Sequence, residues 1–558
     1  MLVAAVLKKE EDYFLVGATG HNYGNTAELS VMNYKQAMET INKEEWLNAI
    51  KIEHAKMQKY NVFEVVHPKD VPKGTKLMNF TWAMKKKASG VYRARLAARG
   101  FQQKVNSQYR EDDKSSPVIN DVSIKIVLTL IVLAGWSTRI TDVEGAFLNG
   151  SFERKHEKLY TEVPEGLKDC YPWWWAILLI LKSMYGTIQG ALQWFREICM
   201  ALKYLSWERN KSDPCLFYKW TDDKLVVFLL WVDDCLVARP EQLVTENTME
   251  FRKLYDTTNE GEMTEYVGCK VERTFEQIRL TQPVKIKRLM DEFGYDGKVK
   301  PNTPAKPGSV LSVDSIGSES VSPEEATKFK SVIGMTNHMV RWSRVDCQNP
   351  NRECSQQVKD PTKMGMLHMD RMCEFMVATG DRGYTVKPDL PGSWDSTKNY
   401  KFKISGESDS EYAKDPTRRS VNCGATFLCG ALIKMFCKMM PIVALSTTEA
   451  ELYSAVLTAQ DMMFAYYIMI GMGLIVELPM VLYIDNRGAV DLANNWSVGG
   501  RTRHMDVKQN YLRELKESGM IRSMWKSGEE ITTDMNTKNT QVKTFWYHSD
   551  KVMSFPSE

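Results

Sequence analysis

The chain has 558 residues, of which 43% are hydrophobic and 26% are charged, and its formal net charge is +3. This length exceeds what one hydrophobic core normally organises, so roughly two to four domains are expected. The composition excludes a disordered chain. The weak net charge means that any binding of nucleic acid must come from local basic patches.

The eleven cysteines include no Cys-x-x-Cys pair, which excludes a zinc ribbon or a zinc knuckle. Scattered thiols in a large chain favour a reducing compartment. The apolar start of the chain is too short for a signal peptide. The longest apolar stretch, at 173–181, is far shorter than a membrane span. We therefore expect an intracellular protein without a membrane partner.

The first half of the chain begins with a tail over 1–30. Apolar residues at helical spacing predict one or two amphipathic helices over 34–60. Short β-rich runs broken by prolines and a glycine follow over 61–100, and 122–134 is apolar enough to be a buried helix. Residues 224–239, KLVVFLLWVDDCLVAR, predict two apolar strands that meet at a polar pair.

The second half begins with a Pro-, Ser- and Gly-rich linker over 301–321. A Met-rich helical stretch follows, and then a second break at 388–396. Beyond it the pattern predicts β-rich segments, a helix from Ser446, a strand that ends at Asp485 and a further helix. This alternation is typical of a compact α/β domain.

Three carboxylates stand out in the first half of the chain. Asp142 follows an apolar segment, and Asp233 with Asp234 form the polar pair of the predicted hairpin. Nucleotidyl transfer requires clustered carboxylates that hold two Mg²⁺ ions. An Asp-Asp pair between apolar runs is more often a simple turn, so the dipeptide alone leaves both interpretations open.

Four motifs around these carboxylates resemble the copia-type family of LTR retrotransposon Pol polyproteins. WVDDCLVA resembles the Asp-Asp motif of reverse transcriptases, and TDVEGAFLNG followed by EKLYTEVPEG resembles the copia-type pattern. LKSMYGTIQGALQWF and YRARLAARGFQQ resemble two further segments of the same family. All four occur in the order of the family.

The resemblance implies roles for individual residues. Asp142 and Asp233 would be the main metal ligands, whereas Asp234 would contribute less because alternation along a strand turns it to the other side. The remaining implied residues would bind the nucleotide or the template: Arg95, Arg99, Phe147, Gln189 and Gly190. Arg95 and Arg99 lie within 85–104, which has seven basic residues and no acid; a solvated basic strand is the alternative.

A second set of carboxylates lies near the C-terminal end. In ALSTTEAELYSAV, Ser446 and Glu449 have the spacing of a capping box at a helix start. This would give Glu449 a structural task and leave Glu451, further into the helix, as the metal ligand. Asp485 ends an apolar strand, where a carboxylate can face a metal.

The same segment resembles the ribonuclease H part of the copia-type family. That resemblance adds Asp409 in GESDSEY and Asp534 in EEITTDMNTK, which gives a two-metal site of Asp409, Glu451, Asp485 and Asp534. His504 and Asp506 fall in a further family-like segment, and we interpret both as structural. The family would use two Mg²⁺ ions per active site, for which Mn²⁺ can substitute.

Together these patterns predict an α+β fold: a right-hand polymerase with fingers, palm and thumb, followed by a ribonuclease H-like α/β domain. The predicted boundaries are a tail (1–30), fingers and palm (31–300), linker and thumb or connection (301–395), ribonuclease H-like domain (396–545) and a tail (546–558).

The implied activity is RNA-templated DNA synthesis with hydrolysis of RNA in RNA–DNA hybrids, serving retrotransposon replication in cytoplasmic virus-like particles or in the nucleus. The implied partners are an RNA template, a DNA primer and deoxynucleoside triphosphates. The alternative is a degenerate or domesticated fragment that binds nucleic acid without catalysis. It is favoured by departures from the family pattern such as KMFCKMM at 434–440. The sequence leaves the oligomeric state open.

Overall fold

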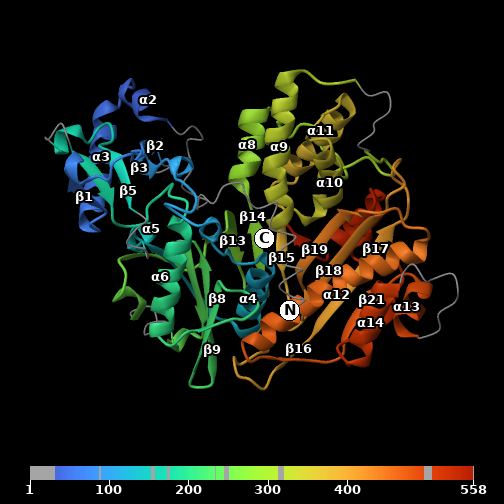
Figure 1. Ribbon diagram of the computed structural model, residues 1–558. Helices are drawn as coiled ribbons and strands as arrows, with labels where there is room; N and C mark the ends of the chain where they lie inside the picture. Colours follow the sequence, from blue (N-terminus) through green and yellow to red (C-terminus); the bar gives the residue numbers. More distant parts are fainter. Residues whose placement is uncertain are drawn as a thin grey trace. The chain divides into compact units, whose positions relative to one another are not determined.

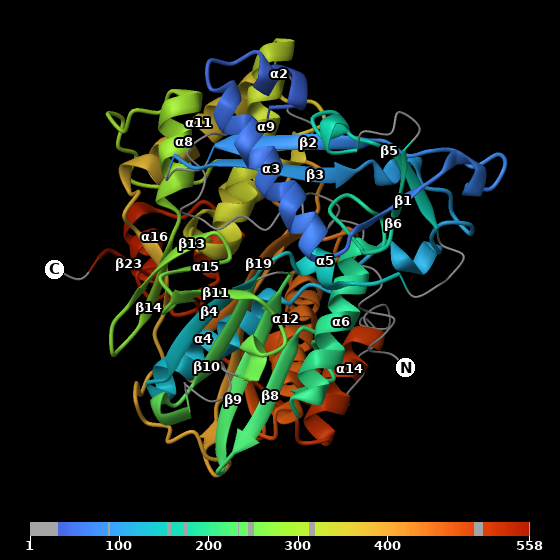
Figure 2. The ribbon, with the colours of Figure 1, turned by 90° about the vertical axis from the view of Figure 1, so that its left-hand side faces the viewer.

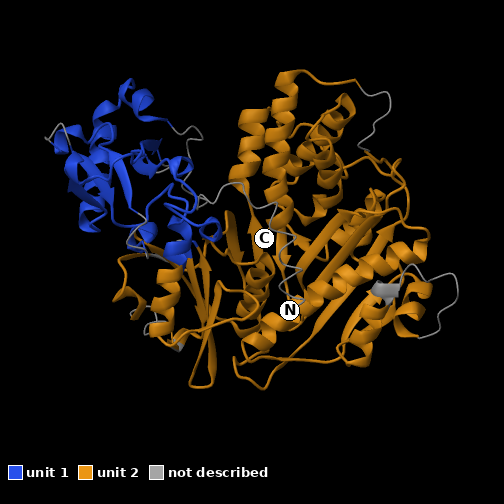
Figure 3. Cartoon of the chain, in the orientation of Figure 1, with its two compact units in different colours: residues 1–115, 145–195, 232–234 blue, residues 116–144, 196–231, 235–558 orange. Residues whose placement is uncertain are grey.

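The structure is a computed structural model (Figure 1) that describes residues 32–86, 90–152, 158–171, 176–232, 234–243, 250–311, 319–495 and 506–556. The chain divides into two compact units, coloured separately in Figure 3. Unit 1 comprises residues 1–115, 145–195 and 232–234, and unit 2 comprises the remainder. Among the described residues, no helix has both the length and the apolar character needed to cross a membrane.

Unit 1 contains two small antiparallel sheets, with strand orders β1-β6-β5 and β2-β3. Trp46 of the long helix α3 packs edge-on against Tyr92 of β3, with ring centroids 4.6 Å apart. The helices and strands expected over 34–60 and 61–100 are confirmed. The elements of unit 1 are α2 (Tyr34–Met38), α3 (Lys43–Lys59), β1 (Phe63–Val66), β2 (Phe80–Lys86), β3 (Tyr92–Ala98), α5 (Ala146–Asn149), β5 (Leu159–Glu162) and β6 (Ile177–Ile180).

Unit 2 begins with a six-stranded sheet of order β11-β4-β10-β9-β8-β7. The strands β9 and β10 are neighbours, as Figure 2 shows, so the hairpin expected over 224–239 is confirmed. The elements of this part are α4 (Asp121–Ala134), β4 (Ser137–Val143), α6 (Gly190–Tyr204), β7 (Glu208–Arg209), β8 (Leu216–Thr221), β9 (Lys224–Trp231), β10 (Asp234–Arg239) and β11 (Thr257–Gly261). Residues 190–195 of α6 and Asp234 of β10 are assigned to unit 1.

The helix α4 is buried along almost its whole length, as its continuous apolar sequence predicts. Asn120 caps its start by accepting a hydrogen bond from the Val122 N–H. Gly135 ends it with φ of 63°, a conformation that glycine adopts without strain. Its neighbours within unit 2 include β15 (Gly383–Val386), α12 (Thr447–Gly471) and β19 (Ala431–Met439), so α4 contacts several layers of this unit.

The middle of unit 2 joins a helical group to a five-stranded sheet of order β12-β13-β14-β15-β23. Residues 301–395, predicted as linker and thumb or connection, contain three of these helices and β15. Residues 546–558, predicted as a tail, instead finish α16 and form β23, which pairs antiparallel with β15. The elements are β12 (Glu265–Tyr266), β13 (Cys269–Arg273), β14 (Ile278–Thr281), α8 (Pro283–Phe293), α9 (Pro323–Trp342), α10 (Gln348–Gln356), α11 (Lys363–Ala378), β15 (Gly383–Val386) and β23 (Met553–Ser554).

The C-terminal part of unit 2 is a mixed sheet of order β19-β18-β17-β21-β22. The first three strands are antiparallel and the last two run parallel to β17. This is the ribonuclease H-like arrangement that was expected, and α12 packs against β17, β18 and β21 (Figure 1). The elements are β16 (Lys401–Phe402), β17 (Ile404–Glu411), β18 (Val421–Leu428), β19 (Ala431–Met439), α12 (Thr447–Gly471), β20 (Ile475–Val476), β21 (Met480–Ile484), α13 (Arg487–Asn494), α14 (Asp506–Glu517), β22 (Ile521–Trp525), α15 (Asp534–Thr537) and α16 (Val542–Ser549).

Candidate active sites

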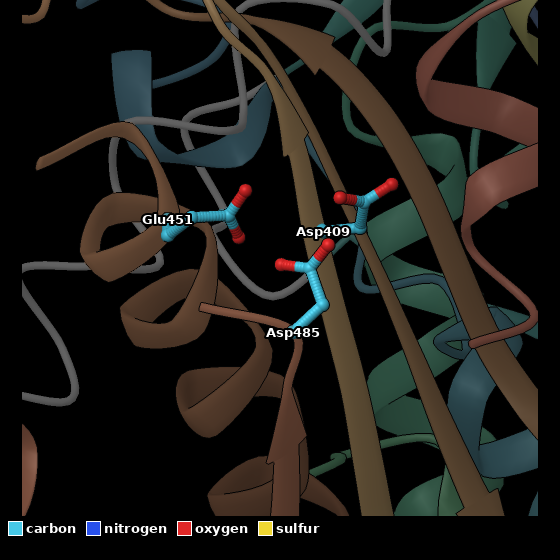
Figure 4. Close-up of side chains that lie close together, drawn as sticks. All are labelled: Asp409, Glu451 and Asp485. Atoms are coloured by element: carbon cyan, nitrogen blue, oxygen red, sulfur yellow. The ribbon is translucent and has the colours of Figure 1, made fainter. Parts of the chain in front are cut away.

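Three carboxylates converge at one end of the C-terminal sheet. Asp409 lies near the end of β17, Asp485 directly follows β21, and Glu451 lies early in α12. Because β17 and β21 are parallel neighbours, their carboxyl ends meet at the same edge of the sheet. One carboxylate oxygen from each residue lies within 4.8 Å of the others, and Figure 4 shows the three side chains gathered at one place.

Burial dominates the electrostatics of this cluster. It raises the pKa of Asp409 to about 7, and the charges of Asp485 and Asp534 add to the increase. Burial, followed by the charges of Asp409 and Asp485, raises the pKa of Glu451 well above its usual value. Burial also raises the pKa of Asp485. The charge of Lys538 opposes these increases at Asp409 and Asp485, but the pKa of both carboxylates stays raised.

Glu451 has one carboxylate oxygen that is satisfied and one that is not. Its Oε1 accepts hydrogen bonds from the Ser410 N–H at 3.1 Å and from the Ser410 hydroxyl at 2.8 Å. Its Oε2 is buried and has no hydrogen-bond partner. A buried oxygen without a donor is costly, and a hard divalent cation with oxygen ligands would satisfy it. The donor set of Asp409, Glu451 and Asp485 therefore fits Mg²⁺ or Mn²⁺.

Asp534, the fourth predicted ligand, lies beside this group rather than within it. It is the first residue of α15, and its Oδ1 is 2.5 Å from the Lys538 Nζ. The Thr537 hydroxyl donates to Asp409 Oδ2 at 2.8 Å. Sequence reasoning assigned no role to Thr537 or Lys538. Their spacing from Asp534, three and four residues along a helical turn, was the available signal.

Glu449 has the structural task that was expected, but with a different partner. Ser446 caps α12 by accepting a hydrogen bond from the Glu449 N–H at 3.1 Å. The Glu449 carboxylate accepts from the Leu445 N–H at 2.8 Å, one residue before the cap, whereas a capping box would use the N–H of Ser446. The helix start is therefore confirmed, and the reciprocal bond is displaced by one residue.

Two further residues of the C-terminal part were interpreted as structural. His504 lies outside the described residues. Asp506 is the first residue of α14. The interpretation of both stays a prediction.

Of the carboxylates predicted for the polymerase site, the structure describes Asp142 in β4 and Asp234 at the start of β10. Asp142 is half-buried in β4, where it pairs with Thr258 of β11. The strand β10, which begins at Asp234, lies between β4 and β9. Asp233 itself lies outside the described residues.

The turn before β10 has an unusual backbone. Val232 has φ of 57°, which a β-branched residue rarely adopts. Its carbonyl oxygen accepts a hydrogen bond from the Trp194 Nε1 at 2.6 Å. Such strained positions cluster at functional sites, and this one directly precedes the predicted metal ligand Asp233.

Two of the family-like motifs meet in unit 1 through glycines. A Cβ on Gly100 would lie 2.2 Å from the carbonyl oxygen of Gly186. A Cβ on Gly186, whose φ is +84°, would lie 2.1 Å from the carbonyl oxygen of Ala98. The Gly100 N–H donates to the Gly186 carbonyl at 3.1 Å. Only glycine allows the two backbones to approach this closely.

Gln189 is completely buried beside this contact. Its Oε1 accepts a hydrogen bond from the Gln103 Nε2 at 2.9 Å, and its Nε2 donates to the Gln108 carbonyl at 3.1 Å. Gly190 begins α6, and a Cβ there would lie 2.6 Å from the Thr187 Oγ1. Gln189 thus links the two motifs, whereas the close contact of Gly190 lies within its own motif. Contact of the Gln189 amide with a nucleotide stays a prediction, and it would require new partners for this amide.

Two of the other predicted nucleotide-binding residues, Arg95 and Phe147, contact the ring of Tyr185 in unit 1. The Arg95 guanidinium lies over the Tyr185 ring, 4.7 Å from its centroid, and the Tyr185 ring meets Phe147 with centroids 5.0 Å apart. The Arg95 Nε is buried without a hydrogen-bond partner. Arg99 is exposed and lines a cavity of about 420 Å³. The sequence analysis assigned no role to Tyr185, although this residue lies in the motif LKSMYGTIQGALQWF.

The first part of the chain matches the model of a known protein family. Residues 60–307 match the model of the family described as reverse transcriptase (RNA-dependent DNA polymerase). This range includes the polymerase carboxylates, whereas the four nuclease carboxylates lie beyond it.

Curated relatives match almost the whole chain. The retrovirus-related Pol polyprotein from transposon TNT 1-94 of Nicotiana tabacum is 27% identical over 521 residues, covering 90% of this chain and 37% of that protein. The polyprotein from transposon RE1 of Arabidopsis thaliana is 25% identical, covering 93% and 34%. The chain thus spans about a third of the length of these relatives. A foamy viral protease-reverse transcriptase in complex with double-stranded DNA is similar at a TM-score of 0.46 and 12% identity, covering 91% of this chain and 73% of that one.

Proposed function

We propose that this relative of the copia-type retrotransposon Pol polyproteins, whose residues 60–307 belong to the reverse transcriptase family, copies RNA into DNA and then cleaves the RNA of the hybrid. The observation that carries the proposal is the cluster of Asp409, Glu451 and Asp485 in a ribonuclease H-like sheet, on the same chain as the reverse transcriptase match. The natural setting would be retrotransposon replication in a virus-like particle.

The nuclease step would rely on buried carboxylates that hold metal ions. Asp409, Glu451 and Asp485 would hold two Mg²⁺ ions, with Asp534 completing the set. Bound there, the ions would supply an activated water and stabilise the leaving oxygen. Ser410 fixes the Glu451 carboxylate, and Thr537 fixes that of Asp409. These two hydroxyls orient the ligands before any cation binds.

The polymerase step would rely on Asp142 and Asp233, with a smaller contribution from Asp234. Their carboxylates would hold two Mg²⁺ ions, which favour attack by the primer 3′ oxygen and departure of pyrophosphate. Arg95 and Arg99 would bind phosphates of the incoming deoxynucleoside triphosphate or of the template.

The binding of the sugar and the template would use a second set of residues. Phe147 would lie under the sugar of the incoming nucleotide. Gln189 and Gly190 would shape the nucleotide and template site. The RNA template, the DNA primer and the RNA–DNA hybrid would be the nucleic-acid partners.

The alternative is a fragment that binds nucleic acid without catalysis, and the family departures at 434–440 favour it. These residues lie in and just after β19, an edge strand that β18 separates from β17 and its carboxylate Asp409. The departures leave every predicted metal ligand in place, which supports retention of catalysis.

Primer extension on an RNA template with Mg²⁺ tests the polymerase proposal. Asp233→Asn should reduce synthesis by several orders of magnitude, because it removes a charge from a site for two divalent ions. The chain offers a matched control in Asp223→Asn, since Asp222 and Asp223 form another Asp-Asp pair, exposed at the turn between β8 and β9. Full synthesis by Asp233→Asn, or equal loss in both variants, would refute the assignment.

A further inference from the structure

Two cysteines face each other in the sheet that carries the nuclease carboxylates. Cys423 of β18 is the register partner of Cys437 of β19, and on its other side Cys423 is the partner of Asp409 in β17. Opposite residues of antiparallel strands have Cα atoms about 4.5 to 5.5 Å apart and point to the same face. A disulfide spans about 4.4 to 6.8 Å between Cα atoms, so register partners such as these two cysteines lie within the range that a disulfide can bridge.

The two cysteines are adjacent and differ in burial. Cys423 is completely buried, and burial together with the neighbouring Cys437 raises the pKa of its thiol. Cys437 is only partly buried. Among the residues that the structure describes, all eleven cysteines are free thiols, and no other two are paired in a strand register. A cysteine residue that is partly exposed thus lies beside one that is completely buried.

The surroundings of Cys437 favour its thiolate. Burial alone would raise the pKa of Cys437, but the Cys423 thiol and the Arg352 guanidinium together bring it below the usual value. Arg352 lies in α10, and its Nη1 is buried without a hydrogen-bond partner. Because the thiolate is the nucleophile in thiol oxidation, Cys437 is the member of the pair that would react first.

We propose that Cys423 and Cys437 are a modification site at which a hydroperoxide forms a disulfide across β18 and β19. The Cys437 thiolate attacks the peroxide oxygen, which breaks the O–O bond and gives a sulfenic acid and an alcohol, or water when the oxidant is hydrogen peroxide. The Cys423 sulfur then attacks the Cys437 sulfur and displaces water. The two thiols lose two electrons and two protons, and the peroxide is reduced.

The bridge would disturb two supports of the nuclease site. Cys437 Sγ lies 2.9 Å from the carbonyl oxygen of Asn536, which belongs to the short helix α15 that begins at Asp534. A bridge to Cys423 removes this thiol donor. It also constrains β18, the strand in which Cys423 pairs with Asp409 of β17. Loss of contacts that orient metal ligands typically lowers activity about 10- to 100-fold. This consequence rests on the proposed function, whereas formation of the disulfide does not.

The test uses the full chain treated with hydrogen peroxide and then digested without reductant. Peptide mapping should find Cys423 joined to Cys437, with the loss of two hydrogens, and a reductant should reverse it. Hybrid cleavage should fall about 10- to 100-fold and return on reduction, while primer extension stays constant. Cys437→Ser should form no disulfide, and its rate of hybrid cleavage should be the same before and after peroxide treatment.

Two further variants complete the design. Cys423→Ala should leave a trappable sulfenic acid at Cys437 and no disulfide. Cys429→Ser removes another buried cysteine at the turn between β18 and β19 and should behave as the unmodified chain. Oxidation that leaves both thiols free, or that joins either to another cysteine, would overturn the proposal. A disulfide in a chain without hybrid cleavage before oxidation would support the site while refuting the nuclease function.

Discussion

Replacing Asp409 by asparagine should separate stability from catalysis in the C-terminal domain. Burial and two neighbouring carboxylates raise the pKa of Asp409 from 3.8 to about 7. The unfolded chain releases this proton near pH 4, whereas the folded chain keeps it until about pH 7. The folded state therefore binds more protons in this window, and stability falls as the pH rises through it.

The size of the effect follows from the shift. About three pKa units at about 1.4 kcal/mol each give roughly 4 kcal/mol of lost stability at pH 7 without metal. Asp409→Asn removes the charge and keeps an amide oxygen to accept from the Thr537 hydroxyl. We therefore expect the variant to be more stable than the unmodified chain by up to roughly 4 kcal/mol at pH 7 in a chelator, and to lose hybrid cleavage.

Urea unfolding between pH 4 and pH 8, with a chelator or with MgCl₂, provides the measurement. The unmodified chain should gain stability from Mg²⁺ and the variant should gain much less. Asp415→Asn is a matched control, because Asp415 is a buried carboxylate of the same domain whose Oδ1 accepts hydrogen bonds from Thr417. A variant of Asp409 that is less stable at pH 7 in a chelator, or that keeps the full pH slope, would refute the reasoning.

The remaining predictions concern other parts of the chain. Glu451→Gln should eliminate hybrid cleavage while DNA synthesis survives. Glu449→Gln keeps an acceptor at the start of α12 and should lower the stability of the fold by at most about 1 kcal/mol. Equal loss of cleavage in both variants would contradict this assignment. Asp142→Asn should lower DNA synthesis by several orders of magnitude and leave hybrid cleavage intact, as paired assays on one preparation would show. Phe147→Val should raise the ratio of kcat/KM for ribonucleotides to that for deoxyribonucleotides about tenfold, or about 1.4 kcal/mol; an unchanged ratio would leave Phe147 as packing. Burial lowers the pKa of Lys125 to about 8 from 10.5, so stability should increase between those pH values, and Lys125→Met should flatten that increase in unfolding experiments.

Local patterns were sufficient to predict the elements that carry the carboxylates. The serine cap at Ser446, the strand that ends at Asp485 and the hairpin before Asp234 each have a signal within a few residues. The convergence of Asp409 and Glu451 with Asp485 came from a family resemblance, because no local signal indicates which strand edges become neighbours.

Other features depended on contacts that the sequence does not reveal. Thr537 and Lys538 act on carboxylates only because α15 packs against β17 and β18. Gln189 carries the family motif, yet its amide is satisfied inside unit 1 by residues some 80 positions earlier. The strand β23 is two residues long, and only its distant partner β15 makes it a strand. Such short elements are defined by their partners rather than by their own propensity.

The pairing of β15 with β23 has a consequence for folding during synthesis on the ribosome. Gly383 pairs with Ser554, so one edge of the sheet β12-β13-β14-β15 stays open while the 166 residues between the end of β15 and the start of β23 are synthesised. During that time β15 presents unpaired N–H and C=O groups, which other extended chains can join. Arg382 lies beside this edge and donates a hydrogen bond to Asp550 at 2.7 Å in the folded chain. This partner is also absent until residue 550 has been synthesised. Chaperone capture or premature association should therefore concentrate on nascent chains that have passed β15 and have not yet released β23.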